Sequence, residues 1–258
     1  MNFNNIVKMK ATIYAITIFL TVVFSLSVKG QAFFDLESGV VFPGYNDVRI
    51  PGEGGTFFSL KDDLTPQNEF FYRIRLGYTI NSRHTLFLLY APLETRSEGS
   101  KAENILFEGV EFPANSQLEG TYKFNSYRLT YRYDIVQKSA FIFGFGFTAK
   151  IRDAKIALSS PGLVSEKTNV GFVPIINFRL KWKMHDHLGL LLEGDALVAP
   201  QGRAEDVLLA LTYKLSDVVG IRAGYRILEG GADNDEVYNF SLFNYASVGI
   251  SYTLRKAK

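Results

Sequence analysis

The chain has 258 residues, of which 47% are hydrophobic, and a formal net charge of +2. This length and composition suit one sizeable domain. Because Cys is absent, a disulfide framework, a lipid-modified N-terminal Cys and a Cys-ligated metal centre are excluded. The near-neutral charge gives no indication of nucleic-acid binding, so no nucleic-acid partner is predicted.

The N-terminal segment has the layout of a secretory signal peptide. Lys8 and Lys10 precede an apolar stretch over residues 11–28, and small residues follow at Gly30 and Ala32. We therefore predict a signal peptide over residues 1–31 and a mature domain over residues 32–258. Cleavage of the signal peptide would remove three lysines and no acidic residue, which shifts the formal charge from +2 to −1. A retained single-span anchor is the alternative, since about 20 apolar residues suffice to cross a bilayer.

The body of the chain alternates apolar and polar residues with a period of two, which predicts β-strands. Residues 127–134 are the clearest case, with Tyr127, Leu129 and Tyr131 on one face and charged or polar residues on the other. The same division recurs over residues 70–80, 141–152 and 172–182. Each of these strands is predicted to have one apolar and one charged face.

The lengths of the connections favour a membrane barrel over a soluble one. Short links at residues 81–82, 136–138, 185–187 and 216–217 alternate with longer ones at residues 44–67, 93–120, 155–168, 200–203 and 229–236. Transmembrane barrels alternate short periplasmic turns and longer external loops in this way. We predict an all-β, antiparallel up-and-down barrel of about ten strands, with eight as the alternative and both termini on the periplasmic side. The runs begin at Phe33, Phe70, His84, Thr121, Ser139, Val170, Leu188, Ala204, Val218 and Val237.

The C-terminal strand resembles the insertion signal of bacterial outer-membrane β-barrels. Ser247, Gly249, Tyr252 and Leu254 occupy the polar, glycine, aromatic and apolar positions of that signal, and four further residues follow. By pattern the chain is similar to the small barrels of the OmpA, OmpX and OmpW type. This resemblance implies an outer-membrane location, contact with membrane lipid and lipopolysaccharide, and insertion by the barrel-assembly machinery. It implies no activity.

The polar face carries more cations than anions, and these side chains are predicted to form a polar network in the lumen. In a narrow barrel they can meet as a salt-bridged plug, because an isolated buried charge is costly. They can also line a small anion-preferring pore. The interpretation favours the plug. The predicted lumen network comprises Arg73, Arg75, Arg128, Arg132, Lys150, Arg152, Arg179, Glu193, Asp195, Asp206, Arg222 and Arg226, with Lys181 and Asp134 on the same face.

No catalytic, cofactor or metal site is predicted. His84, His185 and His187 all fall at predicted periplasmic turns, away from the outer rim where outer-membrane hydrolases usually place a His. Two His at i and i+2 supply too few ligands for zinc, and the acidic turn at residues 229–236 does not have EF-hand spacing. The leading hypothesis is a non-enzymatic envelope protein, structural or with limited passage of small solutes or anions. The alternative is a lipid-modifying hydrolase of the lipid A deacylase or phospholipase type.

Overall fold

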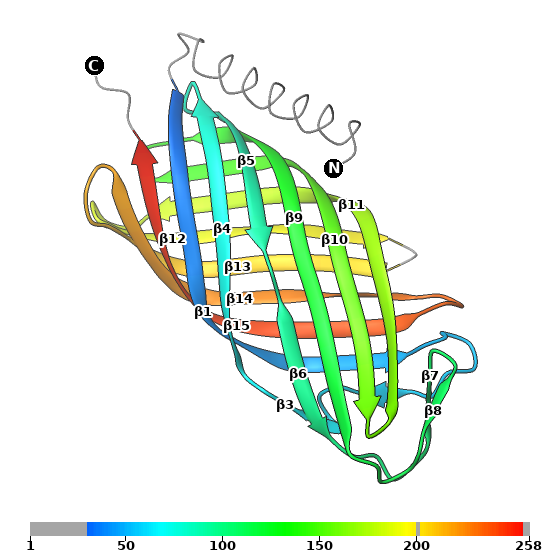
Figure 1. The fold of residues 1–258 in the computed structure, drawn as a ribbon. Coiled ribbons are helices and arrows are strands. Elements are labelled where there is room, and N and C mark those ends of the chain that lie inside the picture. The colour runs from blue at the N-terminus through cyan, green and yellow to red at the C-terminus, as the bar shows by residue number, and fades with distance from the viewer. Residues whose placement is uncertain (1–29, 200–201, 255–258) are drawn as a thin grey trace, which may run out of the picture.

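A computed structural model describes residues 30–199 and 202–254, which form a closed antiparallel barrel of ten strands (Figure 1). Each strand pairs with the next along the chain, and β15 pairs with β1 to close the wall. The barrel strands are β1 (Gly30–Arg49), β4 (Glu69–Ile80), β5 (His84–Ala91) with its continuation β6 (Glu94–Gly99), β9 (Leu118–Gln137), β10 (Phe141–Ser160), β11 (Leu163–Lys183), β12 (Leu188–Ala199), β13 (Gly202–Lys214), β14 (Val219–Asp233) and β15 (Tyr238–Leu254). The predicted fold class is confirmed, with ten strands rather than eight.

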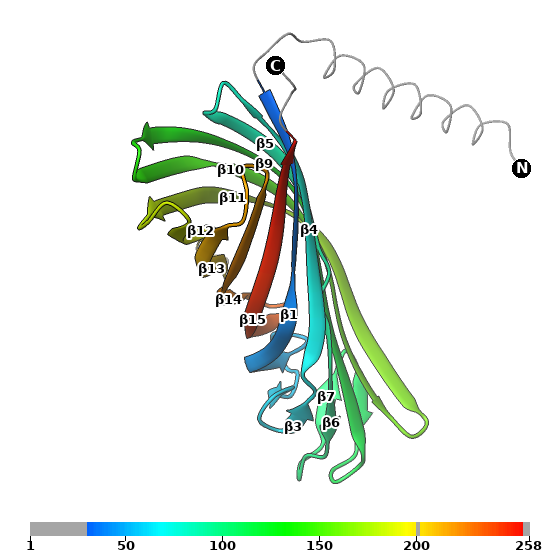
Figure 2. The same cartoon turned by 90° about the vertical axis from the view of Figure 1, so that its left-hand side faces the viewer.

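The two ends of the barrel differ. At one, the turn end, residues 81–83, 138–140, 184–187 and 215–218 connect neighbouring strands, and β1 starts where β15 finishes (Figure 2). The opposite one, the loop end, carries the longer connections at residues 50–68 and 100–117. The predicted signal peptide lies outside the described residues except for Gly30 and Gln31, which already pair with β4. Among the described residues, no helix has the length and apolar character needed to cross a membrane.

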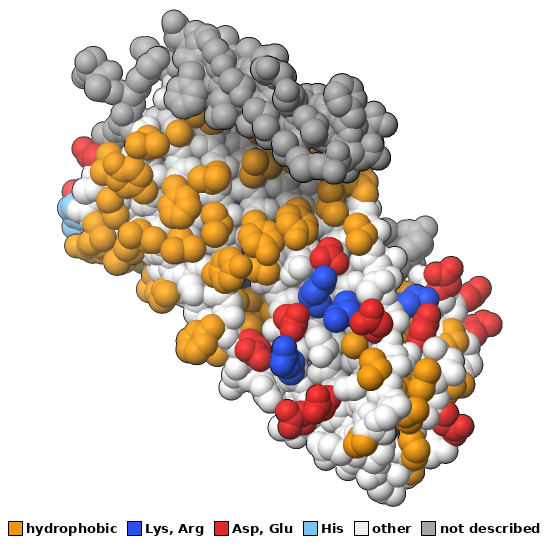
Figure 3. Space-filling model, in the orientation of Figure 1, with side chains coloured by type: hydrophobic (Ala, Val, Ile, Leu, Met, Phe, Trp, Pro, Cys, Tyr) orange, Lys and Arg blue, Asp and Glu red, His pale blue; other side chains and the backbone are white. Residues whose placement is uncertain are grey.

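The outer surface of the wall is apolar, as the alternation of the sequence predicts. Large apolar side chains such as Phe147, Phe172 and Leu211 are more than half exposed, whereas Arg128 and Thr130 on the opposite face are buried. On the face seen in Figure 3, apolar side chains gather in a broad belt over the half of the barrel near the turn end. A belt of this extent would be unstable in water, and together with a charged interior it is the surface of a transmembrane barrel. The protein is thus a transmembrane β-barrel.

Four strands are much longer than a membrane crossing requires. β1, β9, β10 and β11 have 20, 20, 20 and 21 residues, and about 9–11 residues are enough to cross the bilayer. Residues 155–168, predicted to be a long external loop, are instead a continuation of β10 and β11 with a turn at Pro161 and Gly162. The prediction failed because the sense of the alternation reverses there: the outward residues Lys155 and Ser159 are polar, whereas the inward residues Ile156 and Leu158 are buried and apolar.

An apolar cluster fills the interior of the loop end, and we call it the apolar cap. Short strands β2 (Phe58–Ser59), β3 (Leu64–Pro66), β7 (Ile105–Phe107) and β8 (Val110–Phe112) fold the two long connections against the inner wall. The rings of Phe58 and Phe107 meet edge to face, 5.7 Å apart. The cap comprises Val41, Val48, Ile50, Phe58, Leu60, Leu64, Phe71, Leu93, Ile105, Phe107, Phe112, Leu118, Tyr122, Ile156, Leu158, Leu228, Phe243 and Tyr245, all buried.

Candidate functional site

The inward face of each strand changes from charged to apolar at about the same level of the barrel. Along β1, buried Asp35 and Glu37 are followed by buried Val41, and along β4 Arg73 neighbours Phe71 of the cap. Since inward residues recur at every second position, neighbouring strands bring like residues to one level. The lumen therefore contains two layers: the apolar cap at the loop end and a layer of charged side chains below it.

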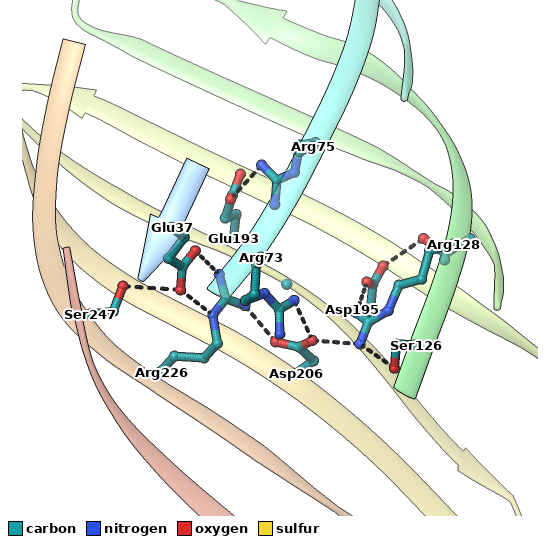
Figure 4. Close-up of polar contacts among 12 residues, drawn as sticks. Glu37, Arg73, Arg75, Ser126, Arg128, Glu193, Asp195, Asp206, Arg226 and Ser247 are labelled. Atoms are coloured by element: carbon teal, nitrogen blue, oxygen red, sulfur yellow. Dashed lines mark hydrogen bonds and ion pairs between the residues drawn. The ribbon is translucent and has the colours of Figure 1, made fainter. Parts of the chain in front are cut away.

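The centre of the charged layer is a chain of ion pairs between Glu37, Arg226, Asp206 and Arg73 (Figure 4). Arg226 donates from Nε and Nη2 to the two Glu37 carboxylate oxygens, both at 2.8 Å. Its Nη1 reaches Asp206, whose other oxygen accepts from Arg73 Nη2 at 2.8 Å. Arg226 is 2% exposed and Glu37 1% exposed, so these charges are removed from solvent and depend on each other.

Arg128 extends this chain toward β12. Its Nη1 donates to Asp195 Oδ2 and its Nη2 approaches Asp206 Oδ2, each at 2.6 Å. Asp195 Oδ1 accepts further hydrogen bonds from the Thr148 hydroxyl at 2.6 Å and from Asn177 Nδ2 at 2.9 Å. Asp195 is thereby held by one cation and two neutral donors, which is how a buried carboxylate is satisfied.

Three more ion pairs lie closer to the turn end. Arg75 Nη1 donates to Glu193 Oε1 at 2.8 Å. Arg179 Nη2 donates to both oxygens of Asp134, at 2.8 and 2.7 Å. The third pair joins Arg222 to Asp35, and Arg222 Nη2 also lies 3.0 Å from Glu37 Oε2. The pair between Arg222 and Glu37 links Arg222 and Asp35 to the central chain, whereas the pairs Arg75–Glu193 and Arg179–Asp134 are separate from it.

Four of the predicted cations have no carboxylate at ion-pair distance in the part of the chain that the structure describes, and one of them, Lys181, is exposed. Arg132 donates only a long hydrogen bond, 3.4 Å, to Asn177 and lies over the Phe87 ring. Lys150 is 2% exposed, with its Nζ 4.6 Å from the centroid of the Phe124 ring. The fourth, Arg152, is half-buried and bonds Asn169 apart from the other charges.

The remaining predicted residues all take part in the ion pairs just described, and we call this set of ion-paired residues the lumen network. Its members are Asp35, Glu37, Arg73, Arg75, Arg128, Asp134, Arg179, Glu193, Asp195, Asp206, Arg222 and Arg226. These twelve residues carry six cations and six carboxylates and so have no net charge. Any cationic excess of the lumen therefore comes from side chains outside the ion pairs.

Sequence reasoning missed the acidic residues of β1. Asp35 and Glu37 alternate with Phe34 and Leu36, which is the same period-two signal as in the other strands. Gly39, Pro43 and Gly44 follow soon after them, so the alternating pattern covers only a few residues. They provide two of the six carboxylates, which explains why the sequence gives the impression of many unpaired cations.

Little space remains between the network side chains. The cavity at its centre, lined among others by Arg73, Arg128 and Arg132, has a volume of about 10 Å³. That is about the smallest space that holds one water molecule. The cap closes the lumen on the loop side of this cavity.

The His residues lie where the sequence predicts. His84 starts β5 and its Nδ1 is 2.8 Å from the Tyr131 hydroxyl, while His187 Nδ1 is 2.9 Å from the Lys214 carbonyl oxygen. Within the described ranges, no group of three or more His, Asp or Glu side chains could hold a metal ion. In the acidic segment Glu229 pairs with Arg203 at 2.7 Å, whereas Arg226 is directed into the lumen network.

Comparison with known proteins shows structural similarity to solved structures at low sequence identity. No family model matches the chain, and no curated protein matches it. Among solved structures, the chain is similar to outer membrane protease OmpT from Escherichia coli (10% identity, TM-score 0.48, covering 89% of this chain and 99% of that one). It is also similar to Ail, the attachment invasion locus protein of Yersinia pestis (10%, 0.41, 88% and 99%), and to Neisserial surface protein A (17%, 0.34, 85% and 96%). At these identities and TM-scores the similarities carry no inference about function.

Proposed function

We propose that this protein is a non-enzymatic outer-membrane barrel with a structural role, whose lumen is closed by an ion-paired plug beneath an apolar cap. The observation that carries this proposal is the buried lumen network, with a cavity of only about 10 Å³ among its side chains. A hydrated ion does not fit into such a space. Solute passage would require several ion pairs and the cap to separate together.

The energetics of the network also favour a plug. Breaking a buried ion pair by removal of one partner typically costs about 3–5 kcal/mol, because the remaining charge is uncompensated. In a water-filled pore the same removal would cost little, since water would solvate the freed group. A plug and a pore therefore respond differently to one pair of substitutions.

Glu193→Ala together with Asp195→Ala is the test. Both carboxylates are buried; the first pairs with Arg75 and the second with Arg128. We expect the purified wild-type protein to show no steady conductance in planar lipid bilayers. The double variant should lose several kcal/mol of folding free energy. A stable double variant that carries anion-selective current, or a wild type with steady conductance, would contradict the plug.

Glu94→Ala together with Glu166→Ala is the matched control. Each of these glutamates is exposed and pairs with a cation on the outside of the barrel. Exposed ion pairs contribute about 0–1 kcal/mol, so this control should retain the stability and the electrical silence of the wild type.

Two features support the absence of enzymatic activity. All three His residues belong to the turn end, and the hydrogen bonds of His84 and His187 go to a Tyr hydroxyl and a backbone carbonyl rather than to a Ser or a carboxylate. In the usual triads, His activates a Ser, Thr or Cys within hydrogen-bond reach, and a carboxylate or amide orients the His. The lumen carboxylates are committed to ion pairs, which leaves them poor general bases.

A further inference from the structure

The barrel wall has a break between β4 and the β5–β6 strand. The β4–β5 ladder ends at the pair Ile74–Tyr90, whereas β4 continues alongside β1 as far as Glu69–Val41. Beyond Ala91 the chain resumes as β6, which pairs with β9 and β3 and not with β4. Residues 69–73 of β4 consequently have no strand partner on this side.

A groove of about 260 Å³ lies at this break, and we call it the lateral groove. Pro92 interrupts the strand here, because proline lacks the N–H that a continuous ladder requires. Aromatic and apolar side chains form one side of the groove, and polar groups form the side nearer the loop end. Its lining consists of Phe70, Phe71, Tyr72, Tyr90, Pro92, Leu93, Glu94, Lys123 and Asn125.

The lateral groove lies where the apolar belt ends. Tyr90 contacts both Tyr72 and Tyr127 through its ring, at centroid distances of 6.2 and 5.2 Å, and all three are on the outer face. Tyrosines are enriched where a membrane meets water. From Tyr127 toward the loop end, the next outward-facing residues of β9 are Asn125 and Lys123. Figure 3 shows mixed charges beginning at this boundary.

The lateral groove extends from the outer surface of the wall to the edge of the apolar cap. Phe70 is 87% exposed, whereas Phe71 and Leu93 are 3% and 5% exposed and belong to the apolar cap. An occupant of the groove would therefore contact aromatic rings outside and the edge of the cap inside. The polar backbone edge of β4 excludes a position at the hydrocarbon centre, where unpaired backbone groups cost several kcal/mol.

From this geometry we propose that the lateral groove binds one acyl chain of an outer-leaflet lipid. The groove is continuous with the lipid-facing belt, so lipid is the molecule always in contact with its mouth. Its aromatic walls suit a flexible hydrocarbon chain, and its polar side is held at the interface by the Lys123–Asp153 ion pair of 2.9 Å. This site is independent of whether the lumen conducts ions.

Photocrosslinking of the full-length protein tests the proposal. The protein is folded into phosphatidylcholine vesicles that contain a small fraction of phosphatidylcholine with a diazirine on one acyl chain, and adducts are mapped by mass spectrometry. We expect adducts on residues 70–72 and 90–93 to exceed those at Phe147 and Phe172, which are exposed elsewhere on the belt, by about tenfold. Groove adducts should saturate at one lipid per protein as the probe fraction rises, whereas belt adducts should rise linearly.

Matched variants separate a binding site from ordinary lipid contact. Phe70→Ala with Tyr72→Ala removes two walls of the groove and should lower adducts on residues 90–93 by about fivefold. Phe147→Ala with Phe172→Ala removes two exposed rings elsewhere on the belt and should leave those adducts unchanged. If the first pair does not fold, Phe70→Ala alone serves, because this ring is largely exposed. The proposal would be overturned if adduct yields followed only the exposure of each residue, or if no adducts formed in the groove. It would also be overturned if both pairs of substitutions lowered the adducts on residues 90–93 equally.

Discussion

Removal of the Glu37 carboxylate should be one of the most damaging single changes to the barrel. This carboxylate accepts two hydrogen bonds from Arg226, one from Arg222 at 3.0 Å and one from the Ser247 hydroxyl at 3.0 Å. Charge-assisted hydrogen bonds contribute about 1.5–3 kcal/mol each, but Arg226 keeps Asp206 and Arg222 keeps Asp35. We therefore expect Glu37→Met to cost about 3–5 kcal/mol, the usual range for an uncompensated buried charge.

A double-mutant cycle with Arg226→Met measures the coupling directly. When both residues are replaced, Asp206 still has Arg73 and Arg128, and Arg222 still has Asp35. Because no charge is then stranded, the double variant should be less destabilised than the two single costs together, by about 2–3 kcal/mol. Equilibrium unfolding in urea with lipid vesicles gives these free energies, and the single Trp182 on the outer face reports unfolding.

Two results would refute this reasoning. One is a cost below about 1 kcal/mol for Glu37→Met, which would mean that water solvates the freed arginines. The other is additivity within about 0.5 kcal/mol, which would mean that the two side chains do not interact. Glu94→Met, at an exposed glutamate that pairs with Arg96, is the control and should change stability by less than about 1 kcal/mol.

Three further outcomes are expected. The mature protein should fractionate with the outer membrane and migrate faster on a detergent gel before boiling than after, since a closed barrel resists unfolding; recovery in the soluble periplasm would contradict this. Phe147→Arg, if near the bilayer midplane, should lower the free energy of unfolding in vesicles by about 2–4 kcal/mol, while Val164→Arg on the extension beyond the belt should lower it by about 0–1 kcal/mol. Equal losses would mean that the belt is not the surface that faces the lipid. Replacing His84, His185 and His187 together by Asn should leave folding and envelope lipid composition unchanged, and loss of a lipid A or phospholipid modification in a folded variant would favour the hydrolase hypothesis.

The sequence by itself determined the inside and the outside of the wall. In a strand, successive side chains point to opposite faces, so the alternation of Tyr127, Leu129 and Tyr131 with Arg128 and Thr130 separates lipid from lumen without any tertiary information. The same local signal located the turns and gave the number of strands. It failed in residues 155–168, because outside the membrane the outer face is polar and the inner face carries the apolar Ile156 and Leu158, the reverse of the pattern within the belt.

Only the tertiary structure decided which charges meet. Partners in the lumen lie on strands far apart in the chain, such as Glu37 and Arg226, and their levels depend on the stagger of strands around the barrel. Local alternation contains no information about that stagger, so Arg179 could be assigned to the lumen but not to Asp134. The apolar cap could not be predicted from the sequence either. Its long connections fold inward because their apolar side chains pack against Val41, Phe71 and Tyr245 of the inner wall. Burial of that apolar surface is a property of the closed barrel rather than of any one segment.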